Sequence, residues 1–435
     1  MVKALRTCLP LATLASVATL ASTAAELPPI PDDAVSPKVP AVARPFDLAD
    51  VTLGPGPFRD AMERNRAYLL RLEPDRFLHT FRLNVGLPST AEPYGGWEAP
   101  GVELRGHSAG HYLSACALMF RSTGDDAFKP RVDAMVDGFA ACQAASESAG
   151  FNPGYLSAFP ESFIDRVEAK EWVWAPWYTL HKVMAGLLDA HRLAGNARAR
   201  DVLVAMADWI AFRVDRLTPE KMQASLEMEF GGMNDVLAGV YALTGDPEHL
   251  RLAQSFDHAA VFDPLARGED PLDGLHANTQ IPKVIGAARE YALTGDARYD
   301  RIARFFWERV AEHRSYAIGG NSDREHFFPT GEFPHHLGSE TAETCNTHNM
   351  LKLTRDLFAQ EPDALTMDFY ERGLYNHILA SQEPARGMFV YLMPLGPGYS
   401  KIYSTPEHSF WCCVGTGMEN HAKYGDTIFA HGDDE

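Results

Sequence analysis

A repeated helical unit is the feature of the sequence that most constrains its fold. The string Tyr-Ala-Leu-Thr-Gly-Asp occurs at 241–246 and again at 291–296, with weaker copies at 122–125 and 193–196. Each copy places a glycine or its equivalent directly after an apolar run with helical spacing, where a left-handed residue often ends a helix. Another helical run follows each copy. The chain is therefore predicted to repeat a unit of helix, turn and helix.

About eleven or twelve helices are expected from Phe58 onward, with strand-like alternation only near 388–395. Paired helices in this number predict an all-α fold, an α/α toroid in which inner and outer helices surround a central cavity. An open solenoid is the alternative, because periodicity does not decide whether the helices close into a ring. In a toroid, alternate helix starts face one mouth, where a small ligand can bind.

The first 25 residues have the pattern of a signal peptide. Lys3 and Arg6 precede an apolar stretch from 9 to 21, and small residues suited to cleavage follow at 22–25. Cys8 lies at the start of this stretch, whereas a lipoprotein carries its cysteine at the end, so lipidation is not expected. We predict export to the periplasm or the exterior. An extended, proline-rich lead-in over 26–45 then precedes a helical barrel over 46–435.

The charge balance excludes some classes of partner. The chain has 39 basic and 58 acidic residues, a formal net charge of −19, whereas non-specific nucleic-acid binding needs a basic surface. Beyond the N-terminus, no apolar run reaches the roughly 18 residues of a membrane-spanning helix. Neither a nucleic-acid partner nor a membrane span is therefore expected.

Four segments at predicted helix starts are rich in aromatic, acidic and histidine residues: 95–112, 172–181, 231–235 and 276–280. Aromatic rings stack on the apolar faces of sugars while polar groups bind hydroxyls, so together these segments predict a carbohydrate pocket. Trp97, Glu103 and His107 are among the residues expected to contact the sugar. The alternative is that such residues are helix caps and packed core side chains.

A cluster of four residues indicates more specific chemistry. Glu343 and Cys345 stand about 70 residues before Cys412 and Cys413, and one carboxylate with three thiolates suits tetrahedral Zn²⁺. Two alternatives stay open, namely free structural thiols and disulfides, the latter within the adjacent pair or involving the cysteines at 116 and 142.

A thiolate held by a metal can act as a nucleophile if an acid protonates the leaving group. Four glutamates lie near enough in the sequence to be that acid, at 325, 332, 340 and 343, and the residues alone do not select one. A closed structural zinc site is the alternative, and it is the commoner role of such a ligand set.

Three strings resemble the β-L-arabinofuranosidase glycoside hydrolases of families 127 and 146. They are Gly-Gly-Asn-Ser-Asp-Arg-Glu-His-Phe at 319–327, Glu-Thr-Cys-Asn-Thr-His-Asn-Met-Leu at 343–351 and Phe-Trp-Cys-Cys-Val-Gly-Thr-Gly at 410–417. The first two are closer to family 146. The strings Gly-Gly-Trp-Glu at 95–98 and Glu-Leu-Arg-Gly-His at 103–107 also fit. The resemblance covers roughly residues 45 to 430.

The resemblance implies an (α/α)₆ barrel and Zn²⁺ bound by Glu343, Cys345, Cys412 and Cys413. It implies that Cys412 is the nucleophile and Glu325 the acid/base of a retaining hydrolysis. The implied substrate is an arabinose-containing oligo- or polysaccharide of plant type, from which terminal β-L-arabinofuranosyl groups are released.

The resemblance also implies sugar contacts by His181, His276 and Tyr391, although no histidine is present near 233–234, where smaller relatives have one. Val102 stands where a cysteine is expected. Full-length relatives continue into β-sandwich domains, which are not expected in this chain. The alternatives are another toroidal carbohydrate enzyme, such as an epimerase or a glycuronidase, or a sugar-binding protein with a structural zinc.

Overall fold

The computed structural model describes residues 27–432, so the signal peptide predicted over 1–25 lies outside the described residues. Sixteen α-helices make up most of this part of the chain. The only strands in it are β1 (Arg44–Pro45) and β2 (Ala430–His431), which pair antiparallel. The predicted all-α class is confirmed.

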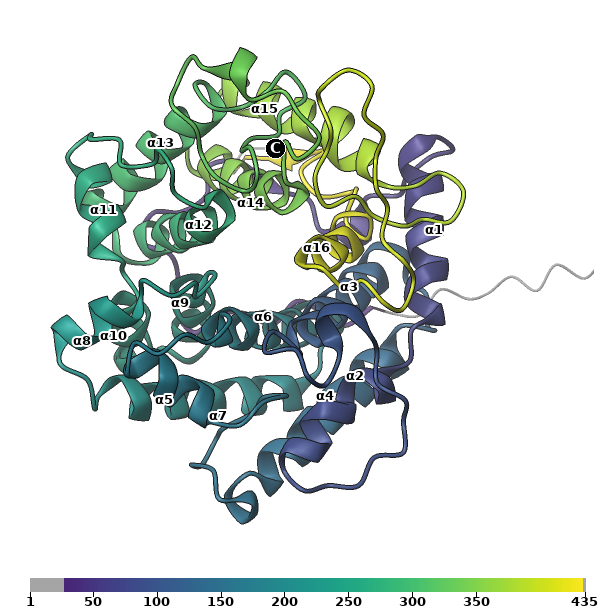
Figure 1. Ribbon diagram of the computed structural model, residues 1–435, viewed down its shortest axis with the longest axis vertical. Coiled ribbons are helices and arrows are strands. Elements are labelled where there is room, and N and C mark those ends of the chain that lie inside the picture. Colours follow the sequence, from purple (N-terminus) through teal and green to yellow (C-terminus); the bar gives the residue numbers. More distant parts are fainter. Residues whose placement is uncertain (1–26, 433–435) are drawn as a thin grey trace, which may run out of the picture.

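Six helices form an inner ring. They are α3 (His107–Thr123), α6 (Pro176–Ala194), α9 (Met233–Thr244), α12 (Ala277–Thr294), α14 (Thr344–Gln360) and α16 (Cys412–Asn420). Each packs against the next, and α16 packs against α3, so the ring is closed (Figure 1). The predicted toroid is therefore confirmed, and the open solenoid is wrong.

Six further helices surround this ring (Figure 1). They are α1 (Pro57–Arg71), α4 (Lys129–Ala145), α7 (Ala197–Val214), α10 (Pro247–Ser255), α13 (Ala297–Ala311) and α15 (Ala364–Gly373). Each buries one apolar stripe. In α13 this stripe includes Ile302, Phe306 and Val310, spaced four residues apart and fully buried. The first outer helix covers the last inner one, since the Asn65 side chain of α1 donates to the Met418 carbonyl of α16 at 2.8 Å.

The repeated string is the turn between an inner and an outer helix. Gly245 and Gly295 have φ values of 71° and 70°, and their N–H groups bond to the carbonyls of Tyr241 and Tyr291 at 2.8 Å. The aspartates that follow, at 246 and 296, cap the first turns of α10 and α13 with their side chains. The string thus ends one helix and starts the next, as predicted.

The number of helices exceeds the prediction because short helices lie within the connecting segments. They are α2 (Pro74–Asn84), α5 (Ser162–Glu168), α8 (Pro219–Ser225) and α11 (Ala259–Ala266). Single 3-10 turns lie at Leu48–Asp50, Gly96–Glu98, Glu147–Ala149, Phe333–His335 and Leu379–Ser381, with a π-helical turn at Leu374–Ile378. Apart from α2, which has 11 residues, these helices have only about two turns and are too short for a clear periodic signal.

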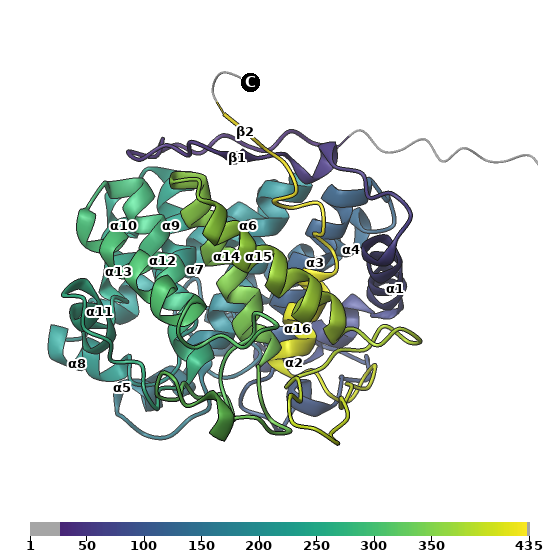
Figure 2. The ribbon, with the colours of Figure 1, turned by 90° about the horizontal axis from the view of Figure 1, so that it is seen from above.

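The two ends of the barrel differ (Figure 2). The long connections gather where the inner helices begin, whereas the extended lead-in crosses the opposite end. There the N–H groups of Val35 and Val39 bond to the carbonyls of Ala242 and Ala292 at 3.1 and 3.0 Å. Because the lead-in covers that end, the mouth at the helix starts is the open end of the barrel.

Within the described range, no helix combines the length and the apolar character that crossing a membrane requires.

Candidate active site

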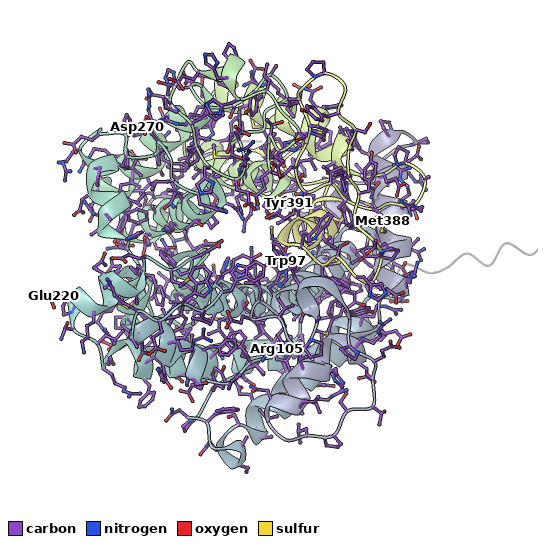
Figure 3. All side chains as sticks on the ribbon, in the orientation of Figure 1. Trp97, Arg105, Glu220, Asp270, Met388 and Tyr391 are labelled. Carbon is purple, nitrogen blue, oxygen red and sulfur yellow. The ribbon has the colours of Figure 1, made fainter. Side chains whose placement is uncertain are left out.

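A cavity of about 170 Å³ lies at this mouth. Side chains from the starts of the inner helices and from the connections before them line it: Trp97, Leu104, Trp174, Tyr178, Glu229, His276, Asn278, Glu325, Glu343, Tyr391 and Cys412. Trp97 and Tyr391 lie beside the central opening (Figure 3). The wall combines three carboxylates with several aromatic rings, the composition expected of a sugar pocket.

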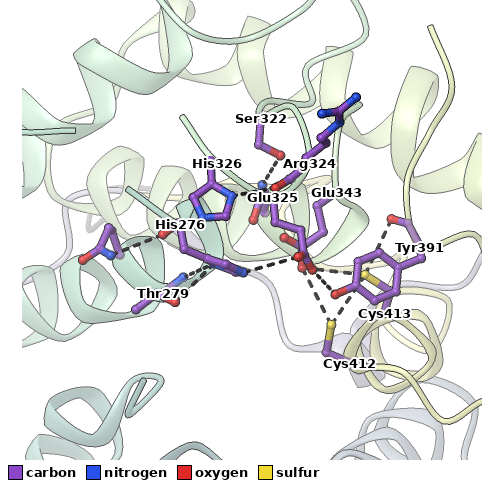
Figure 4. A network of polar contacts seen from close by, with 12 residues as sticks. His276, Thr279, Ser322, Arg324, Glu325, His326, Glu343, Tyr391, Cys412 and Cys413 are labelled. Atoms are coloured by element: carbon purple, nitrogen blue, oxygen red, sulfur yellow. Dashed lines mark hydrogen bonds and ion pairs between the residues drawn. The ribbon is translucent and has the colours of Figure 1, made fainter. Parts of the chain in front are cut away.

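The four predicted metal ligands meet in one wall of this cavity, and Figure 4 shows three of them, Glu343, Cys412 and Cys413. Glu343 stands directly before α14 and Cys345 lies in its first turn, while Cys412 and Cys413 begin α16. Their ligand atoms all lie within 4.8 Å of one another, and all four residues are buried. Two helix starts that face the same mouth therefore bring together residues that are far apart in the sequence.

Three separations in the cluster are close to those of a tetrahedral metal site, whereas the Cys345 and Cys413 sulfurs, 3.1 Å apart, lie closer together. Ligand atoms bound to Zn²⁺ lie roughly 3.5–3.8 Å apart, given Zn–S bonds of about 2.3 Å and Zn–O bonds of about 2.1 Å. The Glu343 Oε1 atom is 3.7 Å from the Cys412 sulfur and 3.9 Å from the Cys413 sulfur, and the two sulfurs are 3.9 Å apart. The other carboxylate oxygen of Glu343 is buried without a hydrogen bond. A cation would satisfy this donor set.

The disulfide alternative does not fit these distances. The sulfurs of Cys345 and Cys413 are 3.1 Å apart and those of the adjacent pair 3.9 Å, whereas a disulfide bond is about 2.0 Å long. The five cysteines of the described chain are all free.

Electrostatics also indicates a cation at this position. Burial raises the pKa of the Glu343 carboxyl, and negative charge on Cys412 and Glu325 raises it further. Burial likewise raises the pKa of the Cys412 and Cys413 thiols. A divalent cation favours the ionised forms of such ligands, so a bound metal would supply the charge that the site lacks.

Glu325 enters the cavity from a loop with an unusual backbone. Ser322, Arg324 and Glu325 have φ values of 81°, 48° and 68°, a left-handed conformation that side-chain-bearing residues seldom adopt outside functional sites. The N–H of Ala277, at the start of α12, donates to the Glu325 carbonyl at 2.7 Å. This bond ties the loop to the inner ring and holds the carboxylate at the cavity.

Two predicted sugar-binding residues contact the Glu325 carboxylate (Figure 4). The Tyr391 hydroxyl donates a short hydrogen bond to Oε1, and His276 Nε2 lies 3.8 Å from Oε2. The N–H of Thr279 donates to His276 Nδ1 at 3.3 Å, which assigns the ring proton to the nitrogen facing Glu325. Burial raises the pKa of Tyr391, so its hydroxyl keeps its proton as a donor.

Trp97 is held against the segment that leads to the cysteine pair. The backbone N–H of Trp97 donates to the Ser409 carbonyl at 3.0 Å, and the backbone N–H of Gly95 donates to the Glu407 carbonyl at 2.9 Å. Gly96 has a φ of 60°, and a Cβ atom there would lie 2.1 Å from the Ser409 oxygen. The Gly-Gly-Trp string thus fits closely against 407–409, and Trp97 becomes part of the cavity wall.

Three other predicted residues are not part of the cavity lining. His107 is fully buried, with Nδ1 2.9 Å from the Leu104 carbonyl and 3.0 Å from the Glu98 carboxylate. His181 is also buried, and its Nδ1 accepts the Gly232 N–H at 3.2 Å. Direct contact of these two histidines with sugar stays a prediction that their placement does not support.

Glu103 is the third, and its carboxylate supports a neighbour that does line the cavity. Oε2 accepts the N–H of Trp174 at 2.9 Å, while Oε1 lies 2.8 Å from the Arg166 guanidinium. Glu103 therefore positions Trp174, and its own contact with sugar stays a prediction.

Sequence reasoning missed Glu229 as a site residue. It lines the cavity two residues before the pair Gly231–Gly232, just outside the segment that was expected to bind sugar. Burial raises the pKa of its carboxyl. Its position two residues before a glycine pair at a helix start was the available signal.

A closed ring of six helix pairs defines the class of α/α-barrel proteins. The structure of a GH127 β-arabinofuranosidase superposes with a TM-score of 0.69 at 17% identity, covering 91% of this chain and 63% of that one. A GH127 β-L-arabinofuranosidase from Geobacillus stearothermophilus T6 superposes with a TM-score of 0.67 at 19% identity, covering 86% of this chain and 65% of that one. An unsaturated glucuronyl hydrolase specific for heparin superposes with a TM-score of 0.50 at 10% identity, covering 84% of this chain and 97% of that one. These structures share the fold, and the chain spans less than two thirds of the two arabinofuranosidases.

The particular family follows from the sequence itself. The family model of the β-L-arabinofuranosidase GH127 catalytic domain matches residues 50–426, and the chain belongs to this family. The predicted resemblance to family 127 is thereby confirmed, whereas greater closeness to family 146 stays a prediction. No curated protein matches the sequence.

Proposed function

We propose that this protein is a retaining glycoside hydrolase that releases terminal β-L-arabinofuranosyl groups from arabinose-containing oligo- or polysaccharides. One observation carries the proposal: in a member of the GH127 family, a buried cluster of one carboxylate and three thiols shares a cavity with a separate glutamate, Glu325. We propose Zn²⁺ as the metal, because sulfur-rich sites with four protein ligands suit it best.

Zn²⁺ bound by Glu343, Cys345, Cys412 and Cys413 would keep the Cys412 sulfur ionised and stabilise it as a leaving group. In the first step this sulfur attacks the anomeric carbon, and Glu325 gives its proton to the departing glycosidic oxygen. In the second step the ionised Glu325 takes a proton from a water molecule, whose oxygen displaces the sulfur from the same carbon. Two inversions retain the configuration.

The contacts of Glu325 suit both of its roles. Tyr391 donates to Oε1, so Oε2 is the oxygen that carries the proton to and from the substrate. His276 lies 3.8 Å from Oε2 and would steady the carboxylate once the proton has left. These two residues are therefore proposed to orient the acid/base, in addition to the sugar contacts expected of them.

Hydrolysis of a chromogenic β-L-arabinofuranoside by the zinc-loaded protein tests this function. Cys412→Ala and Glu325→Gln should each lose at least about 10²-fold in rate, because each removes a group that takes part in bond making or proton transfer. Cys142→Ala is the matched control: this thiol is also fully buried, but it lies in α4 away from the cavity, so turnover should persist.

Other outcomes favour other functions. Near-normal turnover by either site variant would refute the assigned role. Turnover that survives alkylation of the thiols would favour an epimerase or a glycuronidase, and sugar binding without product would favour a binding protein with a structural zinc.

We also propose that the chain is exported, on the basis of its N-terminal pattern. N-terminal sequencing of the protein recovered outside the cytoplasm tests that proposal.

A further inference from the structure

A second depression adjoins the mouth of the barrel. It has a volume of about 230 Å³, and two chain segments line it. One runs from the end of α5 and contributes Val167, Lys170, Glu171 and Trp172; the other runs from the end of α8 and contributes Ala224, Ser225, Glu227 and Met228. We call this depression the outer groove.

Trp172 is the most conspicuous side chain of the outer groove. It is 72% exposed, whereas Trp177, Trp209 and Trp307 are buried. No aromatic partner for the Trp172 ring is found in the described part of the chain. An exposed indole surrounded by charged and polar groups is typical of a recognition surface, because its apolar face gains from being covered.

The two chain segments that line the outer groove also contribute to the proposed active site. Trp174, two residues after Trp172, lines the catalytic cavity, and so does Glu229, which directly follows Met228. Each wall of the groove is therefore joined by one or two residues of chain to the wall of the cavity that contains Cys412 and Glu325. A molecule that extended out of the cavity between these two segments would meet the groove.

Polar contacts fix the segment that carries Trp172. Arg166 donates to the Trp172 carbonyl and lies 2.8 Å from Glu103, whose other oxygen accepts the Trp174 N–H. Lys170 Nζ lies 3.3 Å from Glu227 Oε1, which joins the two walls. The backbone that carries the indole is thus held in place rather than belonging to an unrestrained loop.

Resting on the function proposed above, we propose that the outer groove binds the aglycone of the substrate, a saccharide chain, with Trp172 as a stacking platform. The terminal sugar occupies the cavity, and the next sugar units lie along the groove. Trp172 presents an apolar ring to one sugar face, while Lys170, Glu171 and Glu227 are placed to bind hydroxyls. Trp172 is then a specificity determinant for extended glycans over simple glycosides.

Kinetics with two substrates test this proposal. One is methyl β-L-arabinofuranoside, whose aglycone is too small to reach the groove, and the other is an oligosaccharide of at least three units with the same terminal sugar. Trp172→Ala should lower kcat/KM for the oligosaccharide about tenfold more than for the methyl glycoside, mainly through a higher KM. Trp172→Phe should restore most of the loss because it restores an aromatic face.

Phe212→Ala is the matched control. Phe212 is an aromatic residue of α7 that is 44% exposed but does not line either depression, so its loss should not change the ratio of the two kcat/KM values. An equal effect of Trp172→Ala on both substrates, or none on either, would overturn the proposal.

Calorimetry separates this proposal from the proposed function. Binding of the oligosaccharide is measured in the Glu325→Gln background, with and without Trp172→Ala. A loss of affinity of about tenfold supports the groove even if the native protein hydrolyses neither substrate, a result that would refute only the proposed reaction. Unchanged affinity would show that the groove does not bind the glycan. It would favour contact of Trp172 with another protein instead.

Discussion

Replacement of Gly96 by alanine should disable the active site although Gly96 does not itself line the cavity. The added methyl group is unfavourable for two reasons. The residue would keep a left-handed backbone, at about 1–2 kcal/mol, and its Cβ would lie 2.1 Å from the Ser409 carbonyl oxygen. Since real Cβ contacts essentially never fall below 3.0 Å, the 408–409 backbone has to move by about 0.9 Å.

This displacement occurs next to the proposed chemistry. Ser409 stands three residues before Cys412, and its carbonyl accepts the N–H of Trp97, so the variant shifts one cavity wall and the start of α16 together. A misplacement of about 1 Å costs an enzyme on the order of 10²-fold in rate. We expect kcat/KM to fall about 10²-fold, with a lower metal content, while the barrel remains folded.

The assay is turnover of the chromogenic arabinofuranoside, together with metal analysis and far-UV circular dichroism. Gly101→Ala is the matched control, because Gly101 lies in the same connection and has no heavy atom within 4 Å of its added Cβ. Full activity in Gly96→Ala would refute the reasoning, since it would show that the 407–411 segment can shift without disturbing Cys412.

Two further predictions concern metal removal and pH. A chelator should abolish turnover and lower the melting temperature, and added Zn²⁺ should restore both, because the metal stabilises the folded state by about 2.7 kcal/mol at a hundred times its Kd. Acid stability should depend on Asp235: burial alone would raise its pKa, but Arg289, 2.5 Å away, lowers it from 3.8 to about 2. This pair contributes about 2 kcal/mol to the free energy of unfolding above pH 3.8, and the contribution is lost as the pH falls toward 2. The difference in stability between the native protein and Asp235→Asn should therefore become smaller between pH 3.8 and pH 2, which thermal unfolding measurements can check.

The architecture could be predicted because its signals are local. The string at 241–246 holds a helix end, a left-handed glycine and the next helix cap within six residues, and the structure shows all three. The cluster of Glu343 with the three cysteines could also be predicted, because these residue types together have few other uses. Its members meet because both segments begin inner helices.

The detail of the cavity could not be predicted, because the same residue types serve as ligands and as supports. In the first turns of α6, Tyr178 lines the cavity while His181, almost one turn deeper, bonds to the Gly232 backbone. Glu98 could equally have bound sugar, yet it accepts the N–H groups of Gly106 and Ser108 as the cap of α3. Such choices depend on side-chain direction at a helix start, and sequence spacing does not fix that direction.

The way in which the ring closes has a consequence for biosynthesis. The helix that completes the inner ring, α16, begins with Cys412 and Cys413 and packs against both α3 and α14. A nascent chain therefore cannot assemble the cluster of Glu343 and the three cysteines until nearly all of the barrel has left the ribosome and its two ends have met. Uptake of the proposed metal would then come at the end of folding, and partly synthesised chains would lack the complete ligand set.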